Sequence, residues 1–136
     1  MSVALNVDDR SWEVGSSRFF HAFFSTIAVR LEDGRWGSRF PRLMRDLYSG
    51  SLPGEAAAEA LRELDEVQRG LFALPPSDVV WDAENRDANP PWGDRIAPTV
   101  TNLGNYWWTS DGRELFGVLR EAFVAARERG EPVVVG

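Results

Sequence analysis

Three stretches with apolar residues at helical spacing follow one another in the first half of the chain, and this order constrains the fold more than any other feature. The first begins at the capping residue Ser16 and ends at Asp33; the second ends at Gly50; the third runs from about Pro53 to Pro75. Their apolar faces recur every three or four residues: Phe20, Phe23, Phe24, Ile27 and Leu31; Phe40, Leu43, Met44, Leu47 and Tyr48; Ala57, Ala60, Leu61, Leu64, Val67 and Leu71. Three consecutive helices exclude the strand–helix alternation of a doubly wound sheet.

Strand patterns occur before and after these helices. They are short runs of β-branched and aromatic residues, at 3–7, 79–81, 106–108 and 133–135. A fourth helix is predicted from Asp111 to Gly130, because Asp111 can accept a backbone N–H and Glu114 lies three residues later. The sequence therefore predicts an α+β fold in which about four helices pack on a single layer of mixed or antiparallel sheet with about four strands.

The length and composition predict one domain covering residues 1–136. A chain of 136 residues is long enough to bury a core of its own. It contains no cysteine, which excludes disulfides and thiolate chemistry. No segment approaches the ~20 apolar residues that a membrane span needs, and no signal peptide is visible. We expect a cytoplasmic protein that does not bind membranes.

The chain is acidic, and its basic residues are all of one type. The net charge is −6, and all 15 basic residues are arginines. Binding to the phosphates of a nucleic acid requires clustered positive charge, so we do not expect nucleic acid as a partner. An acidic surface favours a basic protein partner.

Few residues in the chain could perform catalysis. The sequence has no Gly-x-Ser-x-Gly elbow, no phosphate-binding loop, no dinucleotide fingerprint and no His-Glu-x-x-His. The single histidine, His21, lies one position off the apolar stripe of the first helix, which favours a packing or surface role. We therefore expect no enzyme activity, no catalytic residue and no cofactor.

Carboxylates gather at residues 82–89, in a segment with turn composition. Their spacing does not match a calcium-binding loop, so we predict no metal site. Asp82 paired with Asp94 beside Trp92 would resemble a carbohydrate site, in which aromatic faces stack on sugars and acids bind hydroxyls. Two alternatives therefore remain open from the residues alone: a module that binds a small ligand or carbohydrate, and a carboxylate-dependent hydrolase that would use His21.

The region 90–114 is rich in proline, glycine and aromatic residues, and we expect the other elements to be arranged around it. Trp81 and one of Trp107 or Trp108 are predicted to anchor the core. Trp36 and Trp92 each precede a glycine in a turn, so these two are predicted to be the more exposed.

An ordered set of motifs resembles the immunity protein 70 family over nearly the whole chain. The set comprises Asp8-Asp9 after the first strand, the phenylalanine-rich segment 19–24, Trp36-Gly37-Ser38-Arg39-Phe40-Pro41, Trp81-Asp82, Pro90-Pro91-Trp92-Gly93 and Thr109-Ser110-Asp111-Gly112-Arg113. The resemblance implies a small cytoplasmic protein from a bacterial polymorphic toxin system, which binds a cognate toxin and neutralises it without catalysis. It brings no catalytic residues with it, and it leaves open whether the chain forms homo-oligomers.

This implied role yields a hypothesis for the binding surface. If the toxin is basic, the acids Asp82, Glu84, Asp87 and Asp94 could mimic phosphates. Trp36, Trp92 and Arg95 would then serve as the aromatic and arginine anchors that protein interfaces favour.

Overall fold

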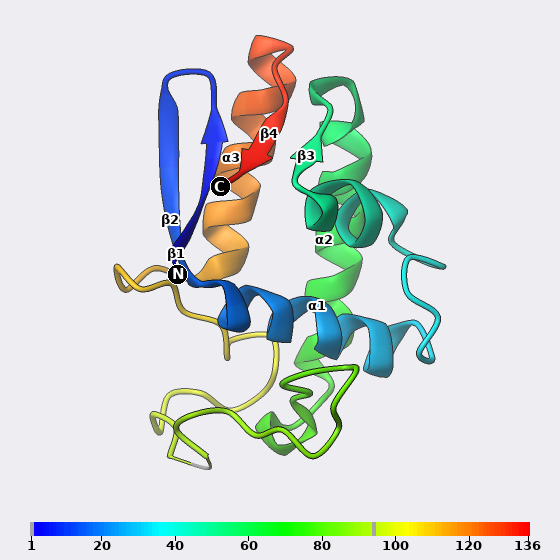
Figure 1. The fold of residues 1–136 in the computed structure, drawn as a ribbon, viewed down its shortest axis with the longest axis vertical. Helices are drawn as coiled ribbons and strands as arrows, with labels where there is room; N and C mark the ends of the chain where they lie inside the picture. Colours follow the sequence, from blue (N-terminus) through cyan, green and yellow to red (C-terminus); the bar gives the residue numbers. More distant parts are fainter. Residues whose placement is uncertain (1, 94) are drawn as a thin grey trace.

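The computed structural model describes residues 2–93 and 95–136. It contains one open antiparallel sheet with the strand order β2-β1-β4-β3 (Figure 1). The strands are β1 (Ser2–Val7), β2 (Arg10–Ser16), β3 (Ser51–Leu52) and β4 (Val133–Val135). Behind the sheet in Figure 1 stand α2 (Ala57–Phe72) and α3 (Leu115–Arg129), and α1 (Ser17–Leu31) crosses below them. In the described part of the chain, the predicted α+β fold with four helices and four strands is confirmed.

The first two strands form a hairpin, of which the sequence pattern predicts only the first strand. Val7 pairs with Arg10, and the turn between them is made by Asp8, whose φ is 54°. Aspartate tolerates this left-handed conformation better than most residues. The sequence predicts a strand at 3–7 and none between it and the first helix, whereas the structure has β2 there, with Trp12 and Val14 buried.

The helices begin and end largely where their sequences predict. Ser16 caps α1, because its Oγ accepts a hydrogen bond from the backbone N–H of Phe19 at 3.1 Å. The second helix is η1 (Arg42–Leu47), a widened π-type turn. A short 3₁₀ turn, η2 (Gly54–Ala56), precedes α2, and Gly130 ends α3 with a φ of 65°.

Two predicted strands and one predicted helix start are wrong. Residues 79–81 and 106–108 lie in a long connection from α2 to α3, and η3 (Pro76–Asp78), a 3₁₀ turn, is the only helix among its described residues. Neither run joins the sheet; Trp108 forms an isolated bridge with Glu114. Their aromatic residues serve packing instead of strand pairing. Helix α3 begins at Leu115 with Glu114 as N-cap, while Asp111 accepts a hydrogen bond from the Thr109 hydroxyl.

Trp107 anchors this connection to the core. It is 1% exposed, and its ring meets Phe23 of α1 edge-on with centroids 5.4 Å apart. Phe23 in turn contacts Phe116 of α3 at 5.5 Å. The connection 73–114 thus lies along α1 at the lower end of the molecule in Figure 1.

Among the described residues, no helix has the length and apolar character to cross a membrane.

Candidate functional site

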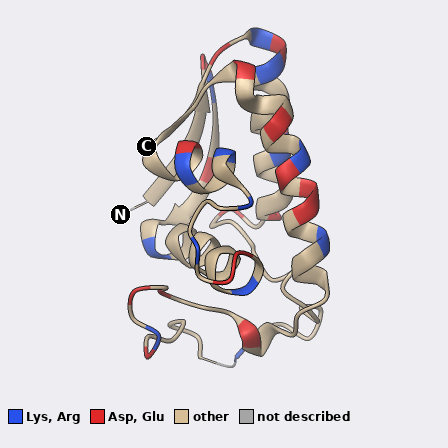
Figure 2. Cartoon of the chain, turned by 90° about the vertical axis from the view of Figure 1, so that its right-hand side faces the viewer, with Lys and Arg blue, Asp and Glu red and all other residues tan. Residues whose placement is uncertain are grey.

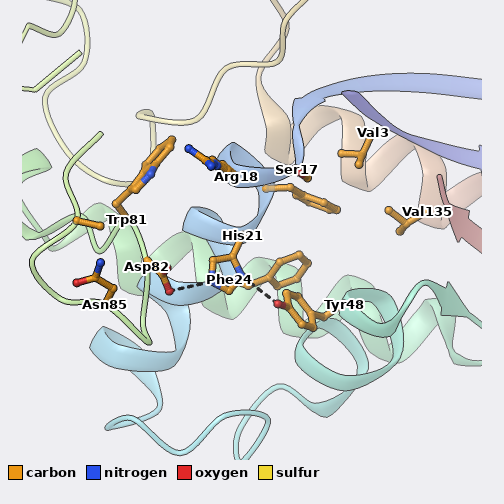
Figure 3. A pocket seen from close by; sticks show the side chains of 12 residues that line it. Val3, Ser17, Arg18, His21, Phe24, Tyr48, Trp81, Asp82, Asn85 and Val135 are labelled. Carbon is orange, nitrogen blue, oxygen red and sulfur yellow. Dashed lines mark hydrogen bonds and ion pairs between the residues drawn. The ribbon is translucent and has the colours of Figure 1, made fainter. Parts of the chain in front are cut away.

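A hollow of about 620 Å³ follows the outer side of α1. Trp81, Asp82 and Asn85 line it from the connection, and Val3 and Val135 line it from the sheet (Figure 3). Its remaining lining comes from α1 and from the end of η1: Ser17, Arg18, Phe20, His21, Phe24 and Tyr48, with Ala88 of the connection. We call this space the α1 groove. Concave spaces of this size, apolar with a few polar groups, are typical of binding sites.

His21 joins three segments at the centre of the α1 groove. Its Nδ1 is 2.9 Å from the Tyr48 hydroxyl, and its Nε2 is 3.2 Å from Oδ1 of Asp82 (Figure 3). The ring also stacks on Trp36, with centroids 6.2 Å apart and an interplanar angle of 23°. The packing role predicted for this histidine is therefore combined with a polar one, because it ties the acidic segment to η1.

The charges of the two partners of His21 are set by their surroundings. The backbone N–H of Glu84 and then the His21 ring lower the pKa of Asp82. Burial, followed by the negative charges of Glu84 and Asp82, raises the pKa of Tyr48. At neutral pH the groove therefore presents an ionised carboxylate and a protonated phenol, which suits hydrogen bonding.

This arrangement meets only part of what a hydrolase needs. His21 does have a carboxylate and a hydroxyl within hydrogen-bond distance. The hydroxyl belongs to Tyr48, however, whose raised pKa opposes its use as a nucleophile. Within residues 2–93 and 95–136, no three histidine, aspartate or glutamate side chains gather where they could hold a metal ion.

Trp36 is held in place by its own loop. The buried carboxylate of Glu32 accepts backbone hydrogen bonds from Gly37, Arg39 and Phe40, each of 3.0 Å. The indole N–H of Trp36 donates to the carbonyl of Met44 at 2.6 Å. Trp36 is half-buried: it is more exposed than the buried Trp12 and Trp107, but less exposed than Trp108.

Trp92 is half-buried too, and it packs against Trp81. Its ring meets Trp81 edge-on at 5.4 Å, and its N–H donates to the Tyr106 hydroxyl at 2.8 Å. Trp81 and Tyr106 also line a second hollow of about 630 Å³, which includes Arg30 and Arg86. The most exposed tryptophan is instead Trp108, at 45%.

The remaining predicted residues lie on the outside of the connection. Glu84, Asp87 and Arg95 are exposed, and Asp94 lies outside the described residues. The structure brings Trp36 and Asp82 together through His21, and Trp92 joins them through Trp81. The sequence pattern does not indicate Tyr48 as a site residue, because this tyrosine follows the apolar stripe of its helix and so resembles a core residue.

The acids of α2 differ from those of the connection. Acidic and basic residues mix along α2 (Figure 2), and Glu59, Asp65 and Glu66 pair with Arg42, Arg120 and Arg39. In contrast, Glu84 and Asp87 take part in none of the ion pairs between described residues. These two exposed carboxylates of the connection are therefore available to a partner.

Comparison with protein families adds one finding. The family model described as Immunity protein 70 matches residues 5–135. No curated protein and no solved structure matches the chain.

Proposed function

Because the chain belongs to the immunity protein 70 family, we propose that it binds a cognate bacterial toxin in the cytoplasm and neutralises it by contact, without catalysis. Membership of this family suggests a toxin immunity protein and a role other than catalysis. Inhibition of this kind requires no reacting group, only a surface that covers or distorts the active site of the toxin.

The observation that carries this proposal is the set of carboxylates beside the α1 groove: Glu84 and Asp87 are exposed and form no ion pair with another described residue, and Asp82 pairs with His21. Asp82, Glu84 and Asp87, together with Asp94 of the same segment, would face a basic toxin and speed its approach. Trp36, Trp92 and Arg95 would flank this charge, although the two tryptophans would offer only their exposed edges. Interfaces concentrate binding energy in aromatic and arginine side chains within a desolvated centre.

The test is a survival assay. The toxin gene that neighbours the gene for this chain is induced in a sensitive host, with and without this chain, and viable colonies are counted. Rescue supports the proposal, and an inactivated toxin controls for the burden of expression. Death of cells that contain both proteins, folded and at similar levels, would contradict it for that pair.

A small-ligand or carbohydrate module is the second candidate, and the size of the α1 groove is the observation that favours it. A ligand stacked on Trp81 would change tryptophan fluorescence. Titration with a panel of sugars and nucleosides tests this candidate, with Trp81→Phe as the control. A flat response across the panel, together with rescue from the toxin, would exclude these ligands in favour of the immunity role.

A further inference from the structure

We propose that the α1 groove receives a segment of the toxin that directs a positive side chain to Asp82 and a negative group to Arg18. This inference rests on the proposed function, and it specifies which surface binds and which chemistry it recognises. The alternative surface is the outer face of the connection, where charge alone would attract the toxin.

The shape of the groove favours an inserted segment over flat contact. It extends along α1 from Trp81 and Asp82 to Val3 and Val135 (Figure 3). A volume of about 620 Å³ is enough for several side chains. Its floor includes Phe20 and Phe24, which are 6% and 1% exposed and belong to the core. An apolar floor with polar groups at its sides suits a peptide segment with mixed side chains.

Two charges of opposite sign face the groove. The hydrogen bonds from His21 and from the N–H of Glu84 both end on Oδ1 of Asp82, and the side chain of Asp82 is 35% exposed. Oδ2 can therefore accept a hydrogen bond from a donor that enters the groove. Arg18 extends from α1 and points towards Trp81 (Figure 3), and none of the ion pairs between described residues includes it.

The two opposite charges would select how the charged groups of the segment are placed. A segment bound in reverse would place like charges together, at Asp82 and again at Arg18, which is costly in a partly desolvated site. The site is also ordered in advance, because His21 holds Asp82 and Tyr48 in position. Preorganisation reduces the entropy lost on binding.

The first experiment blocks the groove. Asn85 and Asn89 are both exposed residues of the connection, but Asn85 lines the α1 groove and Asn89 lines the second hollow. Binding of the inactivated neighbouring toxin domain is measured by calorimetry for Asn85→Trp and for its matched control Asn89→Trp. We expect Asn85→Trp to raise the Kd at least tenfold and Asn89→Trp to change it less than threefold. Circular dichroism and the thermal midpoint establish that both variants are folded.

The second experiment tests the charges. Asp82→Asn and Arg18→Gln are each expected to weaken binding about tenfold, the size of effect that a lost ion pair at an interface produces. The control Arg62→Gln removes an exposed arginine of α2 that also lacks an ion pair with described residues. It is expected to leave the Kd unchanged.

The outcomes separate this inference from the function on which it rests. If the wild type neither binds nor rescues, the proposed function fails and this inference fails with it. If the wild type rescues but Asn85→Trp and Arg18→Gln bind as the wild type does, the immunity role stands and the groove is not the binding site. A loss in Asn89→Trp alone would likewise overturn the inference, because it would place the toxin at the second hollow.

Discussion

Glu32 is a buried carboxylate, 2% exposed, that organises the loop carrying Trp36. One oxygen accepts the N–H of Gly37, and the other accepts the N–H groups of Arg39 and Phe40. Three charge-assisted hydrogen bonds offset the cost of removing this charge from water. The loop in turn places Trp36 against His21, so Glu32, which lies outside the α1 groove, supports a side chain that lines it.

Substitution of Glu32 is expected to cost stability in a graded way. Glu32→Ala would leave three backbone N–H groups without their acceptor, and we expect the free energy of unfolding to fall by roughly 3–5 kcal/mol. Glu32→Gln keeps one acceptor oxygen, so it should lose about half as much. Urea unfolding of both variants measures this. Equal loss in the two variants would mean that the number of accepted bonds does not set the cost.

The widened turn η1 shows how one side chain can shape an element. The N–H of Tyr48 bonds to the carbonyls of Arg45 and Leu43, and so it bypasses the carbonyl of Met44 that an α-helix would use. That carbonyl accepts the indole N–H of Trp36 instead. The side chain of Trp36 thus stabilises the π-type turn, and this turn carries Tyr48 to His21.

Removal of the indole N–H should therefore act on the groove through η1. For Trp36→Phe we expect a loss of about 1–2 kcal/mol, because the carbonyl of Met44 loses its donor. We also expect the ring resonances of His21 to shift, because Tyr48 moves. Trp92→Phe is the matched control, since it also removes an indole hydrogen bond, here to Tyr106, but not one to η1. NMR spectra of the two variants measure the shift of the His21 resonances. Unchanged His21 resonances in Trp36→Phe would contradict the coupling.

The elements differ in how well the sequence predicted them. Helices α1, α2 and α3 carry long apolar stripes, and a stripe of this length fixes the type of element. The runs 79–81 and 106–108 are rich in β-branched or aromatic residues, as strands are, but neither joins the sheet, and Trp108 forms only an isolated bridge with Glu114. Strand pairing is a tertiary property that local composition cannot show. Strand β2 was missed because Gly15 and Ser16 resemble the start of a helix, while the alternation of Trp12 and Val14 spans only three residues.

The residues of the candidate site were also predictable only in part, because some of them come together only through tertiary contacts. The acids and Trp36 were identified from their turn composition, whereas Tyr48 and Trp81 were assigned to packing. The bond between His21 and Asp82 joins residues 61 positions apart, so only the fold could reveal it.

Helix α3 is tied to the hairpin by Glu121, and this tie is expected to depend on pH. Glu121 pairs with Arg113 and accepts the indole N–H of Trp12 at 3.3 Å. Arg113 is the main cause that lowers the pKa of Glu121 below its ordinary 4.5. A carboxyl whose pKa is lower in the folded state stabilises the protein above its unfolded pKa and loses this effect as the pH falls through its folded pKa.

We therefore expect Glu121→Gln to be less stable than the wild type at pH 7. The difference should shrink as the pH falls below about 4.5, the unfolded pKa of glutamate. Urea unfolding between pH 7 and pH 3 measures it. Glu128→Gln, at an exposed position of α3 that forms no ion pair with described residues, serves as the control and should show no such trend. A constant difference for Glu121→Gln at all pH values would contradict the role of its charge.

In the whole molecule, the sheet and two of the helices lie at one end, and the exposed acids of the connection lie at the other. The sheet, α2 and α3 form the packed upper part in Figure 1, and the connection 73–114 covers α1 below. Much of the acidic charge of α2 is paired internally, while Glu84 and Asp87 of the connection are exposed. With a net charge of −6, the molecule should attract a basic partner towards this lower end.

Association with the toxin is therefore expected to depend on salt in a way that locates the charge. The double variant Glu84→Gln, Asp87→Asn should associate several-fold more slowly at low salt than the wild type. The difference should vanish near 0.5 M salt, where the screening length is only about 4 Å. The dissociation rate should change little, because exposed charges act mainly on encounter. Stopped-flow mixing with the inactivated toxin measures these rates.

A second double variant separates local charge from net charge. Glu55→Gln, Glu128→Gln also removes two negative charges, but these exposed residues lie near η2 and the end of α3, away from the connection. If the acids of the connection steer the toxin, this control should associate at nearly the wild-type rate, because the electrostatic field near the connection is unchanged. Equal slowing of both variants would show that net charge alone attracts the toxin, and the acids beside the α1 groove would then lose their special role in encounter.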